Sequence, residues 1–537
     1  MMEIVRDYFF TQQNGINHSP FVDYKNVRKV FEVKNSNGVD YYSRTQYHPF
    51  IARDISFPVH KGAGTLRIFC LGGSAAMGWP HDLSLSYPAF LQKKLELLFP
   101  QKKINVINVA ASTYASYRVR VVFDEVINYQ PDLVLIYSGN NEFLEKILYR
   151  ENRQLDSPWK HIALVRTVYQ VLSGINKKKQ VIDIEHYQPT FLIDVTLGNT
   201  SKLKISPAQS GQVLAHYRYN LLAMVKQAQN KHIPVMLMTV PVNVRDWRPH
   251  ASIHNDELDT VRLQRWQRLY REGLQAFQNR AYSEAVESFS QALAVDDQYA
   301  ELHFYLGKAY LEQGSIQQAR KYFTQSLKTD AYPFRALPEF NAVLREITKE
   351  SKVPLVDIRQ ALAKRSAYSM IGPDVLVDHV HPTVASNQVI ADEVLLAMKK
   401  NGLLKKTDTI SPTKTVLPIP EHAEATLPLM QNLFLVYRVL LQFDKMDDLY
   451  QRCLSLPPHE KNTETYRRFL AEFDQYLQVV QPYEALLFAQ KTGQLLDKFT
   501  RDEAREIVND YIEINRKSLA ANMTTREFER YLPEIDN

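Results

Sequence analysis

The sequence contains little glycine and almost no cysteine, and both shortages exclude whole classes of protein. Its 17 glycines among 537 residues are fewer than half of what the usual share of about 7% would give, which favours helix-rich architecture. The two cysteines, Cys70 and Cys453, exclude a disulfide-dense scaffold and a cysteine-rich zinc module. The histidines show no His-Glu-x-x-His or comparable spacing. We therefore expect neither a metal nor another cofactor.

Long apolar runs and a strong charge of one sign are also missing. No run reaches the roughly 18 residues of a membrane span, and the longest, residues 433–443, contains Arg438. Because no signal peptide is evident either, the sequence predicts a cytoplasmic protein; the alternative is a membrane-associated or extracytoplasmic one whose anchor precedes Met1. With 65 Lys+Arg against 59 Asp+Glu the formal charge is only +6, and no basic stripe predicts nucleic-acid binding.

The sequence does contain an alternation of strand and helix patterns. Its length suggests three or four domains at about 150 residues each. Short apolar runs predict strands at residues 65–71, 104–109, 132–137, 233–240 and 353–358. Helical spacing marks residues 87–99, 119–128, 212–229 and 384–400. Such alternation predicts an α/β fold with a parallel sheet, whose ligand site lies at the carboxyl ends of the strands.

An internal repeat separates the fourth and fifth strands. Five positions recur after 34 residues: Gly273, Ala276, Ala285, Phe289 and Ala292 correspond to Gly307, Tyr310, Ala319, Phe323 and Ser326. This period, with small residues where helices approach and aromatics where they pack, resembles the tetratricopeptide repeat. Since two repeats are fewer than the roughly three needed for stability, we expect capping helices at residues 255–262 and 338–349. Such helices form grooves for peptides, so a protein partner is expected on them.

The remaining sequence completes the predicted domain organisation. Residues 405–425 are rich in Thr and Pro and read as a linker, and helical spacing resumes beyond them. The predicted parts are an N-terminal extension (1–64), a discontinuous α/β domain (65–252 and 331–404), a helical insert (253–330), the linker (405–425) and an all-helical C-terminal domain (426–537).

Two short segments at strand ends carry residues for nucleophilic catalysis. Ser74 follows the first strand among glycines and small residues, and Asp378 and His381 lie in the loop before the last predicted helix. A serine hydroxyl becomes a nucleophile when a histidine removes its proton, and a carboxylate fixes the orientation of that imidazole. Taken singly, these residues fit other roles, because Ser74 and Asp378 would serve as caps and His381 as a packing residue.

Two further segments of interest lie at the carboxyl ends of the second and third predicted strands. Asn141 follows the strand at residues 132–137, and its amide is suited to donate to an oxyanion; an asparagine-rich turn is the alternative. Residues 108–113 (Asn-Val-Ala-Ala-Ser-Thr) offer a backbone N–H to the same place. Trp79 and His81 are expected to line the pocket. Arg245, after the fourth strand, is expected either to bind an acidic or sugar substrate or to pair with Asp246 or the insert.

Together these segments resemble the SGNH (GDSL-like) hydrolases, and GGSAAMGWP, GNNEF and DHVHP resemble bacterial members that carry tetratricopeptide repeats. The resemblance covers about residues 33–400. It implies a flavodoxin-like three-layer hydrolase domain, Ser74 as nucleophile, His381 as general base and Asp378 as its orienting partner. The implied oxyanion donors are the amide of Asn141 and the backbone N–H groups of Ser74 and Thr113.

The implied activity is that of an esterase or O-acyltransferase acting on O-acyl groups of a small molecule, polysaccharide or lipid. The sequence departs from the family pattern at three positions: Gly73 and Glu142 replace aspartates, and Thr113 replaces a glycine whose N–H is an oxyanion donor. A β-branched residue narrows the dihedrals available for aiming that N–H. The alternative is therefore an interaction scaffold, in which the repeats bind a protein and the hydrolase domain is catalytically impaired.

Overall fold

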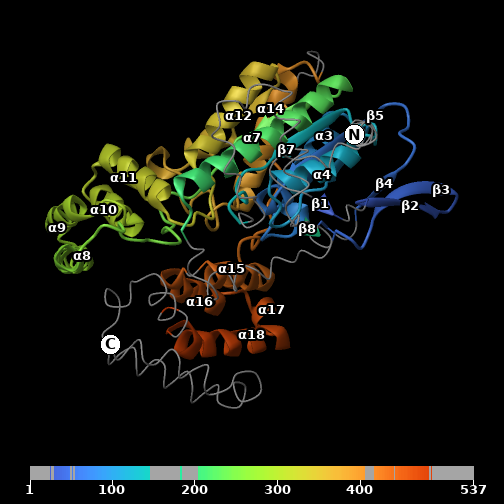
Figure 1. The fold of residues 1–537 in the computed structure, drawn as a ribbon. Helices are drawn as coiled ribbons and strands as arrows, with labels where there is room; N and C mark the ends of the chain where they lie inside the picture. The colour runs from blue at the N-terminus through green and yellow to red at the C-terminus, as the bar shows by residue number, and fades with distance from the viewer. Residues whose placement is uncertain are drawn as a thin grey trace.

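The computed structural model describes residues 24–25, 29–48, 51–52, 55–144, 182–183, 204–404, 416–440, 442–482 and 485. These parts form an α/β unit, a four-helix insert on one side of it and a group of C-terminal helices below (Figure 1). None of the helices described is long and apolar enough to cross a membrane.

A five-stranded parallel sheet is the centre of the α/β unit. Its strands, in spatial order, are β10 (Leu355–Val356), β9 (Val235–Met238), β7 (Leu133–Tyr137), β5 (Thr65–Gly72) and β6 (Lys103–Asn108). Numbered along the chain, this is the order 2-1-3-4-5 of flavodoxin-like folds. The predicted fold class is therefore confirmed. All five strands were expected, although β9 and β10 are shorter than the apolar runs that predicted them.

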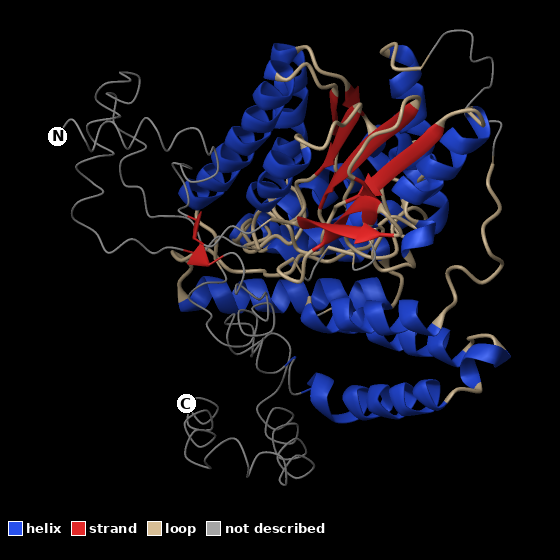
Figure 2. Ribbon diagram, turned by 90° about the vertical axis from the view of Figure 1, so that its right-hand side faces the viewer, coloured by secondary structure: helices blue, strands red, loops and turns tan. Residues whose placement is uncertain are grey.

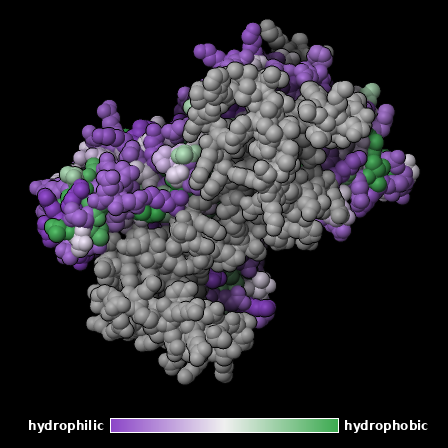
Figure 3. All heavy atoms as spheres, in the orientation of Figure 1, coloured by the Kyte–Doolittle hydropathy of each residue, from purple (hydrophilic) through white to green (hydrophobic). Residues whose placement is uncertain are grey.

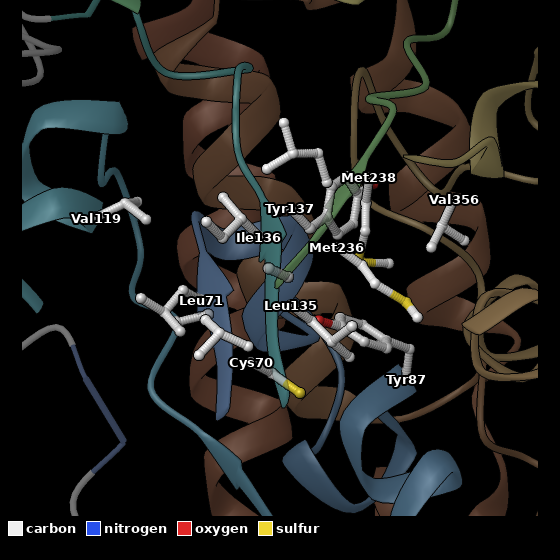
Figure 4. Close-up of a cluster of buried hydrophobic side chains, with 14 of the residues drawn as sticks. Cys70, Leu71, Tyr87, Val119, Leu135, Ile136, Tyr137, Met236, Met238 and Val356 are labelled. Atoms are coloured by element: carbon white, nitrogen blue, oxygen red, sulfur yellow. The ribbon is translucent and has the colours of Figure 1, made fainter. Parts of the chain in front are cut away.

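Helices cover both faces of the sheet, so the unit has three layers (Figure 2). One layer contains α3 (Tyr87–Leu98), α13 (Ile358–Ala363) and α14 (Val384–Lys400). The other contains α4 (Ser116–Val126), α7 (Pro207–Asn230) and α12 (Pro338–Ser351). Because both faces are covered, all five residues of β7 (Leu-Val-Leu-Ile-Tyr) are apolar or aromatic and buried. Figure 4 shows the side chains of Leu135, Ile136 and Tyr137 among labelled side chains of β5 and β9.

The N-terminal extension contains strands that the sequence did not suggest. β2 (Phe31–Ser36), β3 (Val39–Arg44) and β4 (Ser56–Pro58) form an antiparallel sheet. Phe57 packs edge-on against Phe31 and Phe69, with ring centroids 5.1 and 5.4 Å apart, which attaches this sheet to β5. A short parallel pair joins β1 (Tyr24–Lys25) to β8 (Ile182–Asp183).

The insert between β9 and β10 consists of two helical hairpins. Its helices are α8 (Thr260–Gln278), α9 (Tyr282–Val295), α10 (Ala300–Glu312) and α11 (Ile316–Thr329). The repeated glycines allow the helices of each hairpin to approach, because a Cβ on Gly273 would lie 2.5 Å from Phe289 and one on Gly307 would lie 2.7 Å from Phe323. The visible surface of the insert is mostly hydrophilic with scattered apolar side chains (Figure 3).

Of the two expected capping helices, the first is wrong, because the chain turns at residues 255–258 and then enters α8 itself. The second is present as α12, which packs on α7, β9 and β10 and whose Glu339 pairs with Lys328 of α11 at 3.4 Å. Further contacts attach the insert to the α/β unit. Phe304 and Phe323 form a cluster with Met370, and Glu301 accepts a hydrogen bond from Arg248 at 3.0 Å.

The C-terminal region is helical as far as the structure describes it. Its helices are α15 (Leu427–Val439), η7 (Phe443–Lys445), α16 (Met446–Leu454), α17 (Pro458–Lys461), α18 (Glu464–Gln475) and η8 (Tyr476–Val480). We call residues 427–480 the C-terminal helices; the rest of the predicted domain lies largely outside the described residues. The C-terminal helices share a core with Trp247, Ala251, Tyr332 and Phe334, which lie in the chain on either side of the insert.

Candidate active site

The carboxyl ends of β5, β6 and β7 bring three of the four predicted segments together. The chain leaves β5 through Gly72, where φ is +155° and a Cβ would lie 2.0 Å from the carbonyl oxygen of Tyr137. Only glycine fits such a close approach. Ser74 follows as the first residue of α2 (Ser74–Met77), at the edge where the strands end.

The fourth segment supplies the histidine and the aspartate. Ser74 Oγ lies 2.7 Å from His381 Nε2, and His381 Nδ1 lies 2.6 Å from Asp378 Oδ2. Ser74 and His381 are 307 residues apart in sequence, so the fold alone makes this contact. The three residues thus form a continuous hydrogen-bonded chain of hydroxyl, imidazole and carboxylate.

Asp378 is held as a carboxylate by donors on both of its oxygens. Oδ1 accepts the backbone N–H groups of Val380 and His381, each at 2.9 Å, and lies 3.2 Å from His379 Nδ1. Burial by itself would raise the pKa of Asp378, but the neighbouring imidazoles of His381 and His379 outweigh it, and the pKa lies well below the ordinary value. Asp378 therefore stays ionised and keeps a proton on the facing nitrogen of His381.

Asn243 fixes the loop that carries this aspartate, a role that the sequence analysis missed. Its backbone N–H donates to His379 O at 2.9 Å and its side-chain amide donates to Asp378 O at 3.2 Å. Its own carbonyl accepts from the buried Arg335 at 2.6 Å. The available signal was its position just after the strand at residues 233–240, the same kind of position that singled out Asn141.

Asn141 lies beside Ser74. Its Nδ2 donates to Tyr114 O at 3.1 Å, and a Cβ on Gly73 would lie only 2.4 Å from the same nitrogen. An amide nitrogen carries two hydrogens, and Tyr114 uses one of them. The absence of a side chain at position 73, where the family pattern has aspartate, thus makes room for the amide of Asn141.

Thr113 lies in the turn that connects β6 to α4. Ala111 N–H donates to Gly72 O at 3.1 Å and Tyr114 N–H donates to Ala111 O at 3.4 Å, so this turn is attached to the end of β5. Thr113 adopts φ +64°, in the left-handed region that glycine favours, and its buried Oγ1 has no hydrogen-bond partner among the described residues. Thr113 thus occupies a backbone conformation that favours glycine, which is the residue of the family pattern at this position.

Replacing Thr113 by glycine is expected to raise the free energy of unfolding by about 0.5–1 kcal/mol, because glycine relieves the left-handed strain and loses part of that gain to its own flexibility. Chemical denaturation measures the change. Lys352→Gly is the control, since Lys352 also has a positive φ (+54°) but follows α12 and is not β-branched. A Thr113→Gly variant that is less stable than wild type would contradict the claim that the backbone is strained at Thr113.

Glu142 connects the Asn141 segment to the turn that contains Thr113. Its two carboxylate oxygens accept from Ser116 N and Ser116 Oγ, both at 2.8 Å, at the start of α4. Asn220 donates to the same Ser116 hydroxyl at 3.1 Å. Burial raises the pKa of Glu142 to about 7, although the two hydrogen bonds from Ser116 oppose the shift. Glu142 therefore has a structural part in the site.

The raised pKa predicts a pH-dependent stability. The unfolded chain releases this proton near the ordinary value of 4.5, whereas the folded protein holds it up to about 7, so the free energy of unfolding falls as pH rises between these values. Glu142→Gln removes the titration and should gain on the order of 2–3 kcal/mol relative to wild type between pH 4.5 and 8. Glu142→Ala instead leaves Ser116 unsatisfied and should destabilise at every pH. If the free energy of unfolding of wild type and of Glu142→Gln depended on pH in the same way, the raised pKa of Glu142 would be contradicted.

The other predicted site residues have structural contacts. Trp79 packs edge-on against the ring of His381, with centroids 4.7 Å apart, and His81 Nε2 lies 3.1 Å from Pro382 O. The ion-pair partners expected for Arg245, Asp246 or the insert, were wrong: its guanidinium pairs with Asp374 at 2.9 Å.

Asp378, His379 and His381 also form the one cluster among the described residues whose ligand atoms, all within 4.8 Å of one another, suit a metal ion. Two of these three residues already bond one another, because His381 Nδ1 and Asp378 Oδ2 are hydrogen-bonded at 2.6 Å.

Comparison with known families identifies the insert. A model of the TPR repeat matches residues 273–314, and one of the tetratricopeptide repeat matches residues 300–331. The chain contains tetratricopeptide repeats. Both matches fall on α8–α11, where the sequence predicted them. Curated protein sequences gave no match.

Several solved structures are similar to the chain. An acetylxylan esterase from Geobacillus stearothermophilus has 15% sequence identity and a TM-score of 0.28, covering 63% of this chain and 94% of its own. An α/β hydrolase enzyme from the metagenome of Lake Arreo has 12% identity and a TM-score of 0.29, with coverages of 64% and 97%. A GDSL-like lipase from Bacteroides thetaiotaomicron has 13% identity and a TM-score of 0.27, with coverages of 62% and 88%.

Proposed function

We propose that the protein is a serine-dependent esterase or acyltransferase of the SGNH type, acting on O-acyl esters of a carbohydrate or lipid. The observation that carries the proposal is the hydrogen-bonded series Ser74 Oγ, His381 Nε2, His381 Nδ1 and Asp378 Oδ2, with separations of 2.7 and 2.6 Å at its two hydrogen bonds. The sequence motifs support the same activity.

In the proposed reaction Ser74 Oγ attacks the acyl carbonyl while His381 Nε2 takes its proton. Asp378, ionised and hydrogen-bonded to Nδ1, stabilises the imidazolium that forms. The negative oxygen of the tetrahedral intermediate accepts from the second hydrogen of Asn141 Nδ2 and from the backbone N–H groups of Ser74 and Thr113. Collapse breaks the ester bond, and the leaving alkoxide takes the proton from His381.

The acyl group is then bound to Ser74 as an ester. Water, or the hydroxyl of an acceptor, attacks it while His381 removes the proton, and Ser74 regains its own proton as the acyl group leaves. The two outcomes are hydrolysis and acyl transfer, and they differ only in the molecule that enters second.

The proposal is tested by incubating the purified protein with a fluorophosphonate probe and with aryl esters of increasing acyl length. The expected result is covalent labelling on the peptide that contains Ser74, located by mass spectrometry, together with turnover of short-chain esters. An acceptor polysaccharide added to the same assay distinguishes transfer from hydrolysis. If neither labelling nor turnover were seen at any acyl length, the proposal that the protein is an esterase or acyltransferase would be rejected.

The second candidate, a protein-interaction scaffold, is supported by the tetratricopeptide repeats. On α10, however, Glu301, Phe304 and Lys308 share one face and contact the chain's own residues. A protein partner would therefore bind elsewhere on the insert. We retain the predicted boundaries of the domains as part of the proposal, with the insert at residues 253–330.

A further inference from the structure

We propose that the C-terminal helices are a positioning element for the loop that carries Asp378 and His381, and that Tyr437 of α15 is the residue through which they act. The inference rests on the proposed function and extends it, because it assigns a catalytic requirement to a region that carries no catalytic residue.

The first contact is direct. Tyr437 is 5% exposed, and its hydroxyl donates to Val377 O at 3.3 Å, next to Asp378 in sequence. Val377 N–H in turn donates to His381 O at 2.9 Å. The Tyr437 hydroxyl therefore holds the part of the loop that directly precedes Asp378. It does so from a helix 60 residues further along the chain.

A second route runs through aromatic rings. The ring of Tyr437 packs on Trp247 with centroids 5.6 Å apart, and Trp247 packs on His379 at 5.2 Å. His379 Nδ1 is 3.2 Å from Asp378 Oδ1. Trp247 is 3% exposed, so any displacement of Tyr437 leaves a gap that the ring stack beside the aspartate must fill.

The same region also holds the other side of the site. Asn432 of α15 donates to Pro80 O at 2.9 Å, one residue from the Trp79 ring that packs on His381. Glu424, just before α15, accepts from Val384 N, the first residue of α14 and three positions after His381, at 2.6 Å. A short stretch of chain thus contacts the protein on both sides of the histidine.

Ion pairs attach these helices to the segment that contains Asn243. Lys445 pairs with Asp246 at 2.6 Å, and Asp444 pairs with Arg248 at 2.8 Å. Asp246 N–H donates to Asn243 Oδ1 at 3.0 Å, and Asn243 holds the loop through Asp378 O and His379 O. The C-terminal helices consequently support the Asp378–His381 loop both directly and through Asn243.

The test compares Tyr437 with Tyr466, an internal control in the full-length protein. Tyr466 is 6% exposed and its hydroxyl donates to Cys453 O at 3.3 Å, but both partners lie within the C-terminal helices. Tyr437→Phe should lower kcat about 3-fold and Tyr437→Ala about 10- to 100-fold, with KM nearly unchanged, because small misplacement of a catalytic group is costly. Tyr466→Phe and Tyr466→Ala should lower stability to a similar extent and leave kcat unchanged.

A spectroscopic measurement makes the test independent of turnover. The downfield proton resonance of His381 Nδ1–H, assigned by its absence in His381→Gln, should shift or broaden in Tyr437→Ala and remain in Tyr466→Ala. An unlabelled, inactive wild type would reject the proposed function, and this resonance would still decide the inference. Equal kcat values for the Tyr437 and Tyr466 variants, or an unchanged resonance in Tyr437→Ala, would overturn it.

Discussion

Ser74→Ala is expected to abolish fluorophosphonate labelling and to lower kcat for aryl esters by at least about 10⁴-fold. The hydroxyl that lies 2.7 Å from His381 Nε2 is the proposed attacking group, so its removal leaves no oxygen to form the acyl-enzyme. The loss should appear in kcat and in the rate of labelling, whereas the melting temperature should change little because the side chain is partly exposed.

Ser84→Ala provides the matched control. Ser84 is exposed and lies ten residues after the proposed nucleophile, in the 3-10 helix η1 (Leu83–Leu85). Its replacement should leave labelling and turnover at wild-type values. Labelling that persists in Ser74→Ala would place the reactive group elsewhere and would contradict the proposed mechanism.

Gly73→Ala is expected to lower kcat on the order of 10²–10³-fold, about as much as the loss of one oxyanion donor. The added Cβ would lie 2.4 Å from Asn141 Nδ2 and 3.4 Å from Tyr114 O, so the amide must leave its place beside Ser74. Steady-state kinetics should show the decrease in kcat, while His381 and Asp378 keep their hydrogen bond.

Two variants complete this experiment. Asn141→Ala removes the amide itself and should match Gly73→Ala in kcat, and the double variant should be no slower than either, since both remove the same donor. Gly211→Ala is the control, because among the described residues no atom outside the backbone of its own helix and its chain neighbours lies within 4 Å of a Cβ there, and it should leave kcat unchanged. A Gly73→Ala variant with wild-type kcat would contradict the place given to Asn141.

The sheet and the residues at its carboxyl ends were predictable because local patterns encode them. A strand covered on both faces must be apolar throughout, as Leu133–Tyr137 is, and parallel strands bring their ends to one edge. Ser74 and Asn141 were singled out because each follows such a strand, and Asp378 and His381 because they lie in the loop before the last predicted helix at the spacing Asp-x-x-His. The repeat was predictable for the same reason. Gly273 and Phe289 recur as Gly307 and Phe323, and in both hairpins the aromatic ring packs against the glycine of the facing helix.

What escaped prediction depends on tertiary contacts that leave no local pattern. In the N-terminal extension β2 is exposed at all but its first residue and β3 is exposed or half-buried throughout, so neither has the buried apolar run that marked the strands of the parallel sheet. Arg245 has an acidic neighbour in sequence but pairs with Asp374, far along the chain. Tyr437 is an ordinary helical tyrosine until the fold brings it to Val377, and no spacing rule relates the two.

The position of the insert between β9 and β10 also sets the order in which the protein can assemble during synthesis. The helices of the insert contact their neighbours in sequence, and such local contacts form early. Ser74 leaves the ribosome long before His381, and β10 can join the sheet only after the whole insert has been made. The nascent chain therefore carries the proposed nucleophile without its proposed base, and on this mechanism the Ser74 hydroxyl remains an ordinary alcohol until residue 381 has been added and the loop has closed.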